Sequence, residues 1–309
     1  MTRILVTGAS GLLGANLILE AYGAGHTVVA SSRSRQIDHP EIVWIPAELT
    51  SPGAVVDLFN AARPDWVVHS AAATDVDRCE ADPEWAFGLN RDVAGYVAAA
   101  ALKRRARLVH VSTDAVFDGE GGPYSETDPA RPVNAYGESK LAGEAAVIEA
   151  YPGAAIVRTN FYGWSQLRRP SLMEWFLNKL RARDPCIGFT DVWINPVSAS
   201  QLARILLLML ERGLSGIHHI GCRECVSKYE FGLAVAETFE LDASIIRRGT
   251  SGEGELTAQR PGRLCLDVSS AEHELGIRVP RLADGLDEMV ELEQQGYAAR
   301  LAGIVREPA

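Results

Sequence analysis

In the first half of the chain, short apolar and β-branched runs alternate with longer segments whose apolar positions have helical spacing. The predicted strands cover residues 4–6, 27–30, 42–45, 66–69, 108–111 and 155–157, and the predicted helices cover residues 11–22, 52–62, 83–102 and 134–150. Runs that are apolar throughout are typical of strands buried on both faces of a parallel sheet. Since strands that alternate with helices are joined by right-handed crossovers, the pattern predicts a doubly wound α/β fold.

The pattern changes after residue 165, where helical spacing dominates. Helices are predicted at residues 171–183, 198–211, 227–239 and 283–294, and the Gly-rich acidic stretch 249–255 is expected to be a mobile loop. We therefore expect residues 1–165, with a returning segment near residues 192–220, to form a sheet domain. Residues 166–309 are expected to form mainly a smaller, mostly helical lobe.

The composition is that of a globular protein, with 47 % apolar residues, 23 % charged residues and a net charge of −10. The apolar fraction excludes a disordered chain, and the acidic balance without a basic stripe argues against a nucleic-acid partner. The longest uncharged run, residues 4–19, is shorter than the roughly 20 residues of a membrane span and contains several polar positions. We expect no membrane segment, no signal peptide and a cytoplasmic location.

The five cysteines are few and odd in number, which suits free thiols in a reducing compartment. Cys222 and Cys225 form a Cys-x-x-Cys pair, the pattern of a redox pair or of half a zinc site. A structural zinc site needs four ligands, and no second pair exists, although His218 and His219 lie close by. We interpret the two cysteines as incidental thiols in a loop and expect no metal site.

The segment TGASGLLG, residues 7–14, follows the first predicted strand and opens the first predicted helix. In a Rossmann-type unit the three glycines allow a tight turn, close approach to a pyrophosphate, and packing of the helix on the sheet. The helix N-terminus adds free N–H groups and a partial positive charge. The position of the motif predicts a dinucleotide site that includes Gly8, Ser10, Gly11, Leu12, Leu13 and Gly14.

The end of the second predicted strand indicates which dinucleotide binds. An NAD site usually carries an Asp or Glu at this point, which accepts the ribose 2′-OH. The segment ASSRSR, residues 30–35, has no acid there. Its Ser32 and Arg33 suit a 2′-phosphate, because guanidinium groups form charge-assisted hydrogen bonds with phosphate oxygens. The sequence therefore predicts NADP(H) as the cofactor.

Tyr136 and Lys140 are four residues apart in a predicted helix, so they share one face. An ammonium beside a phenol stabilises the phenolate and lowers a pKa that starts near 10. Such a phenol exchanges a proton with a carbonyl or an alcohol near neutral pH. Thr113 follows the fifth strand and offers a hydroxyl to the same substrate oxygen, so these three residues are the catalytic candidates.

Together these features resemble the short-chain dehydrogenase/reductase superfamily, and their spacing resembles its extended branch, which handles nucleotide sugars. The segments STDAVFDG (112–119), PYSE (123–126) with Pro132, and YGESKLAGE (136–144) closely resemble the dTDP-4-dehydrorhamnose reductase family. AAATDVD (71–77), Cys79-Glu80, Asn90, and RPGR (260–263) followed by Leu266-Asp267 are also similar to it. The resemblance covers nearly the whole chain and is densest from residue 108 to residue 144.

The resemblance implies that NADPH delivers hydride to the C4 ketone of a dTDP-linked 4-keto-6-deoxysugar, the substrate held mainly by residues 166–309. Tyr136 would donate the proton, Lys140 would orient the nicotinamide ribose and tune Tyr136, and Thr113 would hold the ketone. A homodimer is common in the wider family. Besides the turn and strand-end residues, cofactor contacts are implied for Glu48, Leu49, Ala71, Ala72, Ala73, Tyr136, Lys140 and Asn160, and substrate contacts for Thr74, Val76, Thr113, Asp114, Phe161 and Arg260.

Three positions bear on the substrate. Family members often have Tyr where this chain has Ala115, and Trp where it has Phe161, so the particular sugar is left open. Phe161 keeps an apolar face for a sugar ring but lacks the indole donor. Arg260 is expected to grip the substrate diphosphate, since a guanidinium fork matches phosphate oxygens.

Three other functions occur in proteins that resemble this chain: dehydration, epimerisation and a non-catalytic binding role. Sugar 4,6-dehydratases that resemble this fold carry a second acid after the Asp, where this chain has Ala115, and epimerases usually show the acidic end of the second strand. The regulatory β subunit of methionine adenosyltransferase resembles the same family and keeps the NADP site while it serves as a binding partner. A non-catalytic role therefore stays open, although intact Thr113, Tyr136 and Lys140 favour catalysis.

Overall fold

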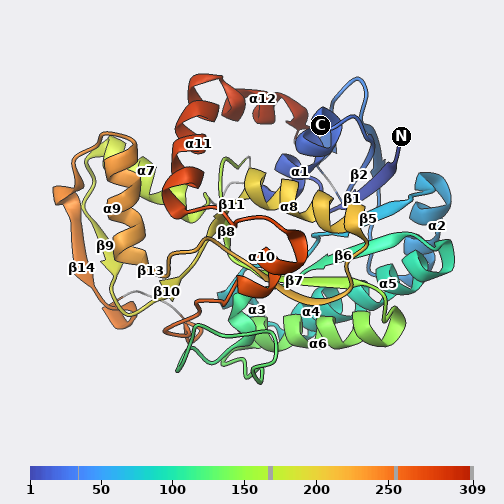
Figure 1. The fold of residues 1–309 in the computed structure, drawn as a ribbon, viewed down its shortest axis with the longest axis horizontal. Coiled ribbons are helices and arrows are strands. Elements are labelled where there is room, and N and C mark those ends of the chain that lie inside the picture. Colours follow the sequence, from blue (N-terminus) through green and yellow to red (C-terminus); the bar gives the residue numbers. More distant parts are fainter. Residues whose placement is uncertain (34, 166–169, 254–256, 307–309) are drawn as a thin grey trace.

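The computed structural model describes residues 1–33, 35–165, 170–253 and 257–306. At its centre is a sheet of seven parallel strands in the order β12-β7-β6-β5-β1-β2-β4, with helices on both faces (Figure 1). The expected Rossmann-type doubly wound α/β fold is confirmed, and every strand predicted in the first half is present. The strands are β1 (Arg3–Thr7), β2 (Thr27–Ser32), β4 (Val43–Pro46), β5 (Trp66–His69), β6 (Arg107–Val111), β7 (Ala155–Thr159) and β12 (Gly216–Ile220).

The first strand lies inside the sheet, and the chain leaves it in two directions. β1 pairs with β2 on one side and with β5 on the other, and Leu5 is in register with both Val29 and Val67. The chain moves outward through β2 and β4, then crosses back and moves the opposite way through β5, β6 and β7. Open α/β sheets bind ligands at the carboxyl ends of the strands where these directions diverge, here the loops after β1 and β5.

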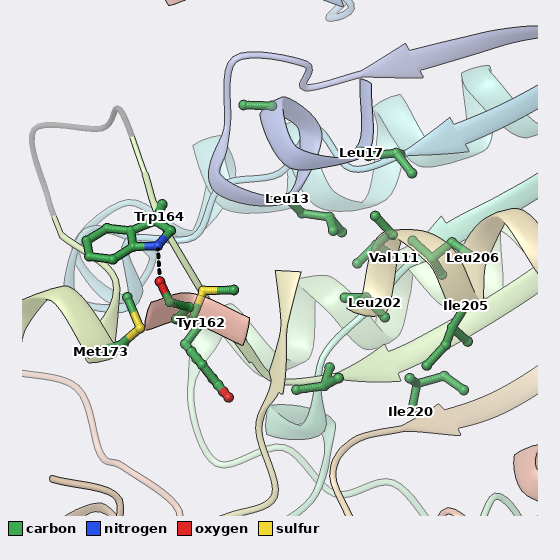
Figure 2. Close-up of a cluster of buried hydrophobic side chains, with 14 of the residues drawn as sticks. Leu13, Leu17, Val111, Tyr162, Trp164, Met173, Leu202, Ile205, Leu206 and Ile220 are labelled. Carbon is green, nitrogen blue, oxygen red and sulfur yellow. Dashed lines mark hydrogen bonds between the residues drawn. The ribbon is translucent and has the colours of Figure 1, made fainter. Parts of the chain in front are cut away.

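Helices bury both faces of the sheet. Leu17 of α1 and Leu206 of α8 (Figure 2) belong to one buried cluster with Val6 of β1. Leu5 belongs to the cluster on the other face. Successive residues of β1 thus enter different cores, which explains why the strand is apolar throughout. The helices are α1 (Leu12–Gly23) and α8 (Ala199–Arg212) on one face, and α2 (Pro52–Ala62), α5 (Val93–Arg104) and α6 (Ala135–Ala150) on the other.

The helix predicted over residues 83–102 is broken into three parts. α4 (Pro83–Phe87) continues into a π-helical turn, η1 (Gly88–Asp92), before α5 begins. In the π-turn the Asn90 side chain is buried, where it hydrogen-bonds to Ala73 and to Ser139 of α6. π-turns of this kind are frequent at functional sites, because the extra residue redirects a side chain. Helical spacing alone did not predict this interruption.

Most of the second half of the chain forms a smaller lobe beside the sheet (Figure 1), whereas α8 and β12 return to the sheet. This half contains short strands as well as the four predicted helices. β9 pairs with β14 in parallel, and β10 pairs with β13 in antiparallel orientation. The elements are β8 (Phe161–Tyr162), α7 (Leu172–Ala182), β9 (Cys186–Phe189), β10 (Trp193–Ile194), β11 (Val197–Ser198), β13 (Val226–Ser227), α9 (Lys228–Thr238), β14 (Ile246–Gly249), α10 (Ser269–Leu275), α11 (Leu282–Gln294) and α12 (Tyr297–Ile304).

The last strand returns to the amino-terminal half of the molecule. β15 (Val305–Arg306) pairs in antiparallel orientation with β3 (Gln36–Ile37), just after the end of β2. α3 (Val76–Ala81) lies before α4 and follows the loop after β5. In the part of the chain that the structure describes, no helix is both long and apolar enough to cross a membrane.

One expectation from the sequence is wrong. The cysteines are not all free thiols, because Cys225 forms a disulfide with Cys265, which is 40 residues away in sequence and is brought beside it by the fold. The stretch 249–255, expected to be a mobile loop, begins at the last residue of β14 (Ile246–Gly249) and includes a 3-10 turn at residues 251–253. This turn is held because Asp191 accepts hydrogen bonds from Ser251; residues 254 and 255 lie outside the described residues.

Candidate functional site

A cavity of about 710 Å³ opens at the carboxyl ends of the strands, where the two chain directions diverge. Most of the candidate residues line it, although they come from distant parts of the sequence. A larger cavity of about 1020 Å³ lies against α1, α8 and α12 and contains none of them. The predicted residues that line the first cavity are Gly8, Ser10, Gly11, Leu12, Leu13, Gly14, Ser32, Arg33, Glu48, Leu49, Ala71, Ala72, Ala73, Thr74, Thr113, Tyr136, Asn160 and Phe161.

The glycine turn after β1 leaves no room for side chains at two of its positions. Gly8 has a φ of +72°, and a Cβ there would lie 2.6 Å from the backbone nitrogen of Ala71. A Cβ on Gly14 would lie 2.2 Å from the carbonyl oxygen of Gly8. No side chain caps the amino end of α1, whose N-cap is Gly11. Backbone N–H groups at this end are therefore available to an anion.

The end of β2 carries a cation at the rim of the cavity. The Arg33 guanidinium lies 3.8 Å from the Glu48 carboxylate, and both side chains are more than half exposed. Such an exposed pair is weak, so Arg33 is free to turn toward an anionic ligand. Ser32 is more constrained, because its hydroxyl accepts a hydrogen bond from the Trp44 indole and donates to the Arg35 carbonyl.

The loop after β5 is fixed by Asn90. Its side-chain oxygen accepts from the Ala73 nitrogen at 2.8 Å, and its amide donates to the Ala73 carbonyl at 3.1 Å. The same amide donates to the Ser139 hydroxyl at 2.9 Å. Because Ser139 lies on α6 between Tyr136 and Lys140, Asn90 ties one wall of the cavity to the helix that carries the catalytic candidates.

Tyr136 and Thr113 meet at the cavity. Burial raises the pKa of the Tyr136 phenol to about 12, and a hydrogen bond with Thr113 opposes this rise. The Thr113 hydroxyl also donates to Asp114 Oδ1, at 3.1 Å. Tyr136 is therefore protonated near neutral pH, which is the form that donates a proton.

Lys140 does not play the electrostatic part expected of it. It is fully buried and does not line the cavity, and its ammonium donates to the Val111 carbonyl at 2.7 Å. Its charge is not among the causes that shift the pKa of Tyr136, and that pKa is raised. The expectation that Lys140 lowers the pKa of Tyr136 is thus wrong for this structure, because burial dominates.

Asp114 lies behind the site and does not line the cavity. Its carboxylate accepts from Thr113 and, at 3.0 Å, from the Asn160 amide. Burial raises the pKa of Asp114 to about 6, and these hydrogen bonds oppose the rise. Asp114 thus orients Thr113 and Asn160, two residues that do line the cavity.

Arg260 is held by a protein carboxylate. Its guanidinium donates to both carboxylate oxygens of Asp77, at 3.0 and 3.1 Å, and neither Arg260 nor Val76 lines the cavity. Asp77 also accepts from the backbone nitrogens of Thr257 and Ala258. The expectation of a guanidinium directed at the substrate diphosphate is not met in this structure, because Nη2 is bound by Asp77 and Nη1 donates to the Ala258 carbonyl.

Trp85 was not among the sequence candidates, yet it lines the cavity beside Thr74. The Arg78 guanidinium carbon lies 3.7 Å from the centroid of its ring. The sequence feature that could have indicated Trp85 is its position as an aromatic residue near the start of a predicted helix, soon after the family-like segment 71–80. Ser165, Pro170 and Ser171 also line the cavity from the lobe side, where helical spacing gave no indication of a site.

Comparisons with known proteins agree with this geometry. The family profile described as "RmlD substrate binding domain" matches residues 1–295. The probable low-salt glycan biosynthesis reductase Agl14 of Haloferax volcanii is 37 % identical over 287 residues, which cover 91 % of this chain and 95 % of that protein.

Two further similarities are informative. The β subunit of methionine adenosyltransferase 2 from Mus musculus is 33 % identical, over 89 % of this chain and 83 % of its own length. A crystal structure of dTDP-4-dehydrorhamnose reductase from Bacillus anthracis in complex with NADP superposes with a TM-score of 0.81 at 25 % identity. It covers 94 % of this chain and 99 % of that one.

Proposed function

Because the chain belongs to the RmlD substrate binding domain family, we propose that it is an NADPH-dependent reductase. Its substrate is the C4 ketone of a nucleotide-linked 4-keto-6-deoxysugar, with dTDP as the nucleotide. The observation that carries the proposal is one cavity that brings together the glycine turn, Arg33, and the Thr113–Tyr136 pair. These are a pyrophosphate site, a candidate 2′-phosphate site and a proton donor, each on a different element.

The residues present fit NADPH. The clash of a Cβ at Gly8 or Gly14 leaves a turn of bare backbone, against which a pyrophosphate can lie, and the uncapped end of α1 favours its charge. Arg33 stands at the strand end where an NAD site would carry an acid. When bound, NADPH supplies the hydride, while the protein supplies binding, orientation and a proton.

The protein groups divide the remaining work. Tyr136 donates its phenolic proton to the ketone oxygen. The neighbouring Thr113 hydroxyl, which donates to Asp114 in this structure, turns its proton to that oxygen as a second hydrogen bond. Two such donors stabilise the charge that develops there, each by about 3 kcal/mol in comparable sites. Lys140, held by the Val111 carbonyl, keeps further N–H bonds for the cofactor ribose. Phe161 offers an apolar face to the sugar ring.

The direct test is NADPH oxidation with a panel of dTDP-linked 4-keto-6-deoxysugars, with products identified by mass spectrometry and NMR. We expect one member of the panel to be reduced at C4. Tyr136→Phe should keep NADPH affinity and lose about 100-fold or more in kcat, as removal of a general acid does. Tyr151→Phe is a matched control, because it removes a hydroxyl from the residue that follows the other end of α6, about 20 Å along the helix axis.

The outcomes also separate the competing role. If the wild type binds NADPH but reduces no member of the panel, the reductase proposal fails, and a binding role like that of the methionine adenosyltransferase relative is favoured. Equal turnover by Tyr136→Phe and wild type would leave reduction in place but remove Tyr136 as its proton donor.

A further inference from the structure

Glu144 is a fully buried carboxylate, and the reaction as described so far does not use it. It lies on α6 four residues after Lys140 and eight after Tyr136, so all three face the same side of the helix. That side packs on the ends of β6 and β7. Burying a carboxylate is costly unless it is paired and hydrogen-bonded. The groups that bind Glu144 therefore indicate its role.

Arg158 of β7 holds the carboxylate in a forked arrangement. Its Nε donates to Glu144 Oε1 at 3.0 Å, and its Nη2 donates to Oε2 at 2.7 Å. The Ser112 hydroxyl donates to Oε1 as well. The side chains of Glu144 and Arg158 are 2 % and 5 % exposed, so this is an ion pair of the interior.

These contacts fasten α6 to the strand end that precedes Thr113. Lys140 donates to the carbonyl of Val111, and Glu144 accepts from the side chain of the next residue, Ser112. One face of α6 therefore grips two consecutive residues of the chain. The third residue in that row, Thr113, makes the hydrogen bond with Tyr136.

We propose that Glu144, held by Arg158, is a positioning residue for the proposed reduction. It fixes α6 against the end of β6 so that Tyr136 and Thr113 meet one oxygen, and it supplies the negative charge that faces Lys140. The positioning role rests on the proposed function. The effect of Glu144 on the pKa of Lys140 does not depend on that function.

The charged and titratable groups around Lys140 support the electrostatic part. Burial lowers the pKa of Lys140 to about 8, and Glu144 is the neighbour whose charge raises it. His69 of β5 and His110 of β6 also face Lys140. Burial and the charge of Lys140 lower the pKa of His69 to about 3 and that of His110 well below its usual range, so both rings are neutral. Arg158 of β7 is paired with Glu144.

A purely structural role makes a different prediction. Replacing both members of a buried ion pair by apolar residues is often neutral or stabilising, whereas removing one member leaves an unpaired charge and destabilises strongly. The double variant Glu144→Leu/Arg158→Leu therefore separates stability from positioning. The exposed pair Arg181–Glu293, which joins α7 to α11, provides the matched control as Arg181→Leu/Glu293→Leu.

We expect the double variant to unfold within a few degrees of the wild type and to bind NADPH within about threefold. Its kcat should fall about 10- to 100-fold with little change in KM, because a misplaced donor affects the reacting geometry. The single variant Glu144→Asp should lose less kcat than the double variant, because the aspartate keeps the negative charge. The control pair should leave kcat, KM and the pH profile unchanged.

The pH profile gives an independent reading. In the proposed reaction Lys140 donates to the Val111 carbonyl and to the cofactor ribose, and its ammonium is the stronger donor, so activity should fall as pH rises through the pKa of Lys140. Without Glu144 that pKa is lower by about one unit or more, so the alkaline limb of kcat should move to lower pH by the same amount. NMR titration of ¹³C-labelled lysine Cε measures the pKa of Lys140 directly, without substrate. If the wild type reduces no sugar, the proposed function fails while this pKa shift still tests the positioning role.

A double variant with the wild-type kcat and an unchanged Lys140 pKa would overturn the inference. If that variant does not fold, Glu144→Gln takes its place, since the amide keeps the shape and an acceptor for Ser112. It should have a lower melting temperature and, at a temperature where circular dichroism shows it folded, the same shift of the alkaline limb. An unshifted limb in the folded Glu144→Gln variant would also overturn the inference.

Discussion

The two sides of the candidate site are held together by different kinds of contact. The side that we call the cofactor wall, residues 8–14, 32–33 and 71–73, is made of turns that directly follow β1, β2 and β5. The other side is supported by residues 257–267, called the strap here, none of which lines the cavity. The strap binds α3, which follows the lining residue Thr74, and it is held by partners far away in sequence. Asp77, for example, is 183 residues from the Arg260 that it binds. Local backbone shape builds the wall, and tertiary contacts build the strap.

The strap connects the lobe to the loop that carries Thr74. At one end, Asp77 of α3 accepts from the backbone nitrogens of Thr257 and Ala258 and from Arg260. At the other end, the Asn195 amide pairs with both backbone groups of Leu266, and Cys265 forms the disulfide with Cys225. A disturbance of the strap should therefore change how the lobe meets substrate, and a disturbance of the wall should change cofactor binding.

The largest effect is expected from Gly14→Ala in the wall. The added Cβ would lie 2.2 Å from the Gly8 carbonyl oxygen, a backbone atom that cannot give way without moving the turn. We expect a loss of about 1–3 kcal/mol in the free energy of unfolding, typical of overpacking, and about 10- to 100-fold in NADPH affinity.

Gly23→Ala is the control in the same helix, because nothing lies within 4 Å of its added Cβ. Denaturant unfolding and calorimetric titration with NADPH measure both quantities. If Gly14→Ala binds NADPH as tightly as Gly23→Ala does, the bare turn is not what shapes the cofactor site.

The same contrast explains which parts of the site could be predicted from the sequence alone. The glycine turn, the arginine at the end of β2 and the Tyr-x-x-x-Lys pair are local patterns. The glycines, Arg33 and Tyr136 line one cavity because the ends of parallel strands meet at one edge, while Lys140 is buried behind Tyr136 on the same helix. Phe161 and Asn160, which were assigned through the family resemblance, line it as well.

What the sequence did not predict depends on distant partners. Arg260 looked free for a diphosphate because nothing local indicated Asp77, and Cys265 looked like a free thiol because Cys225 is 40 residues away. The direction of the pKa shift of Tyr136 also depended on burial, which spacing on a helix does not reveal. Each of these errors concerns which groups the fold brings together or buries.

A smaller effect is expected from Arg33→Ala, which tests the electrostatics of the wall and not its shape. Arg33 lies 3.8 Å from Glu48 with both side chains largely exposed, so its removal should hardly change stability. We expect NADPH affinity to fall about tenfold more than NADH affinity, since only NADPH carries the 2′-phosphate that a guanidinium binds. Titration with both nucleotides decides this, and equal losses would show that Arg33 does not contact the 2′-phosphate.

The smallest effect is expected from Arg260→Met, which tests whether the strap is pinned by Asp77 or grips the substrate directly. Backbone N–H groups of the strap, first that of Ala258, and Arg260 lower the pKa of Asp77. This stabilisation is therefore present at neutral pH and is lost as pH falls through the lowered pKa of Asp77. Because Asp77 keeps its two backbone donors, Arg260→Met should cost about 1 kcal/mol or less in unfolding free energy and leave NADPH affinity unchanged.

The companion variant Asp77→Asn decides between the two roles of Arg260. If Arg260 acts by pinning the strap, both variants should raise KM for the nucleotide sugar by the same few-fold, because each breaks the same pair. If Arg260 releases Asp77 and grips the diphosphate during turnover, Arg260→Met should raise KM about tenfold or more, the scale of a lost charge-assisted contact, while Asp77→Asn should not. A large rise in KM confined to Arg260→Met would make the strap a substrate-binding element, and the difference between the two sides of the site would then be one of sequence distance alone.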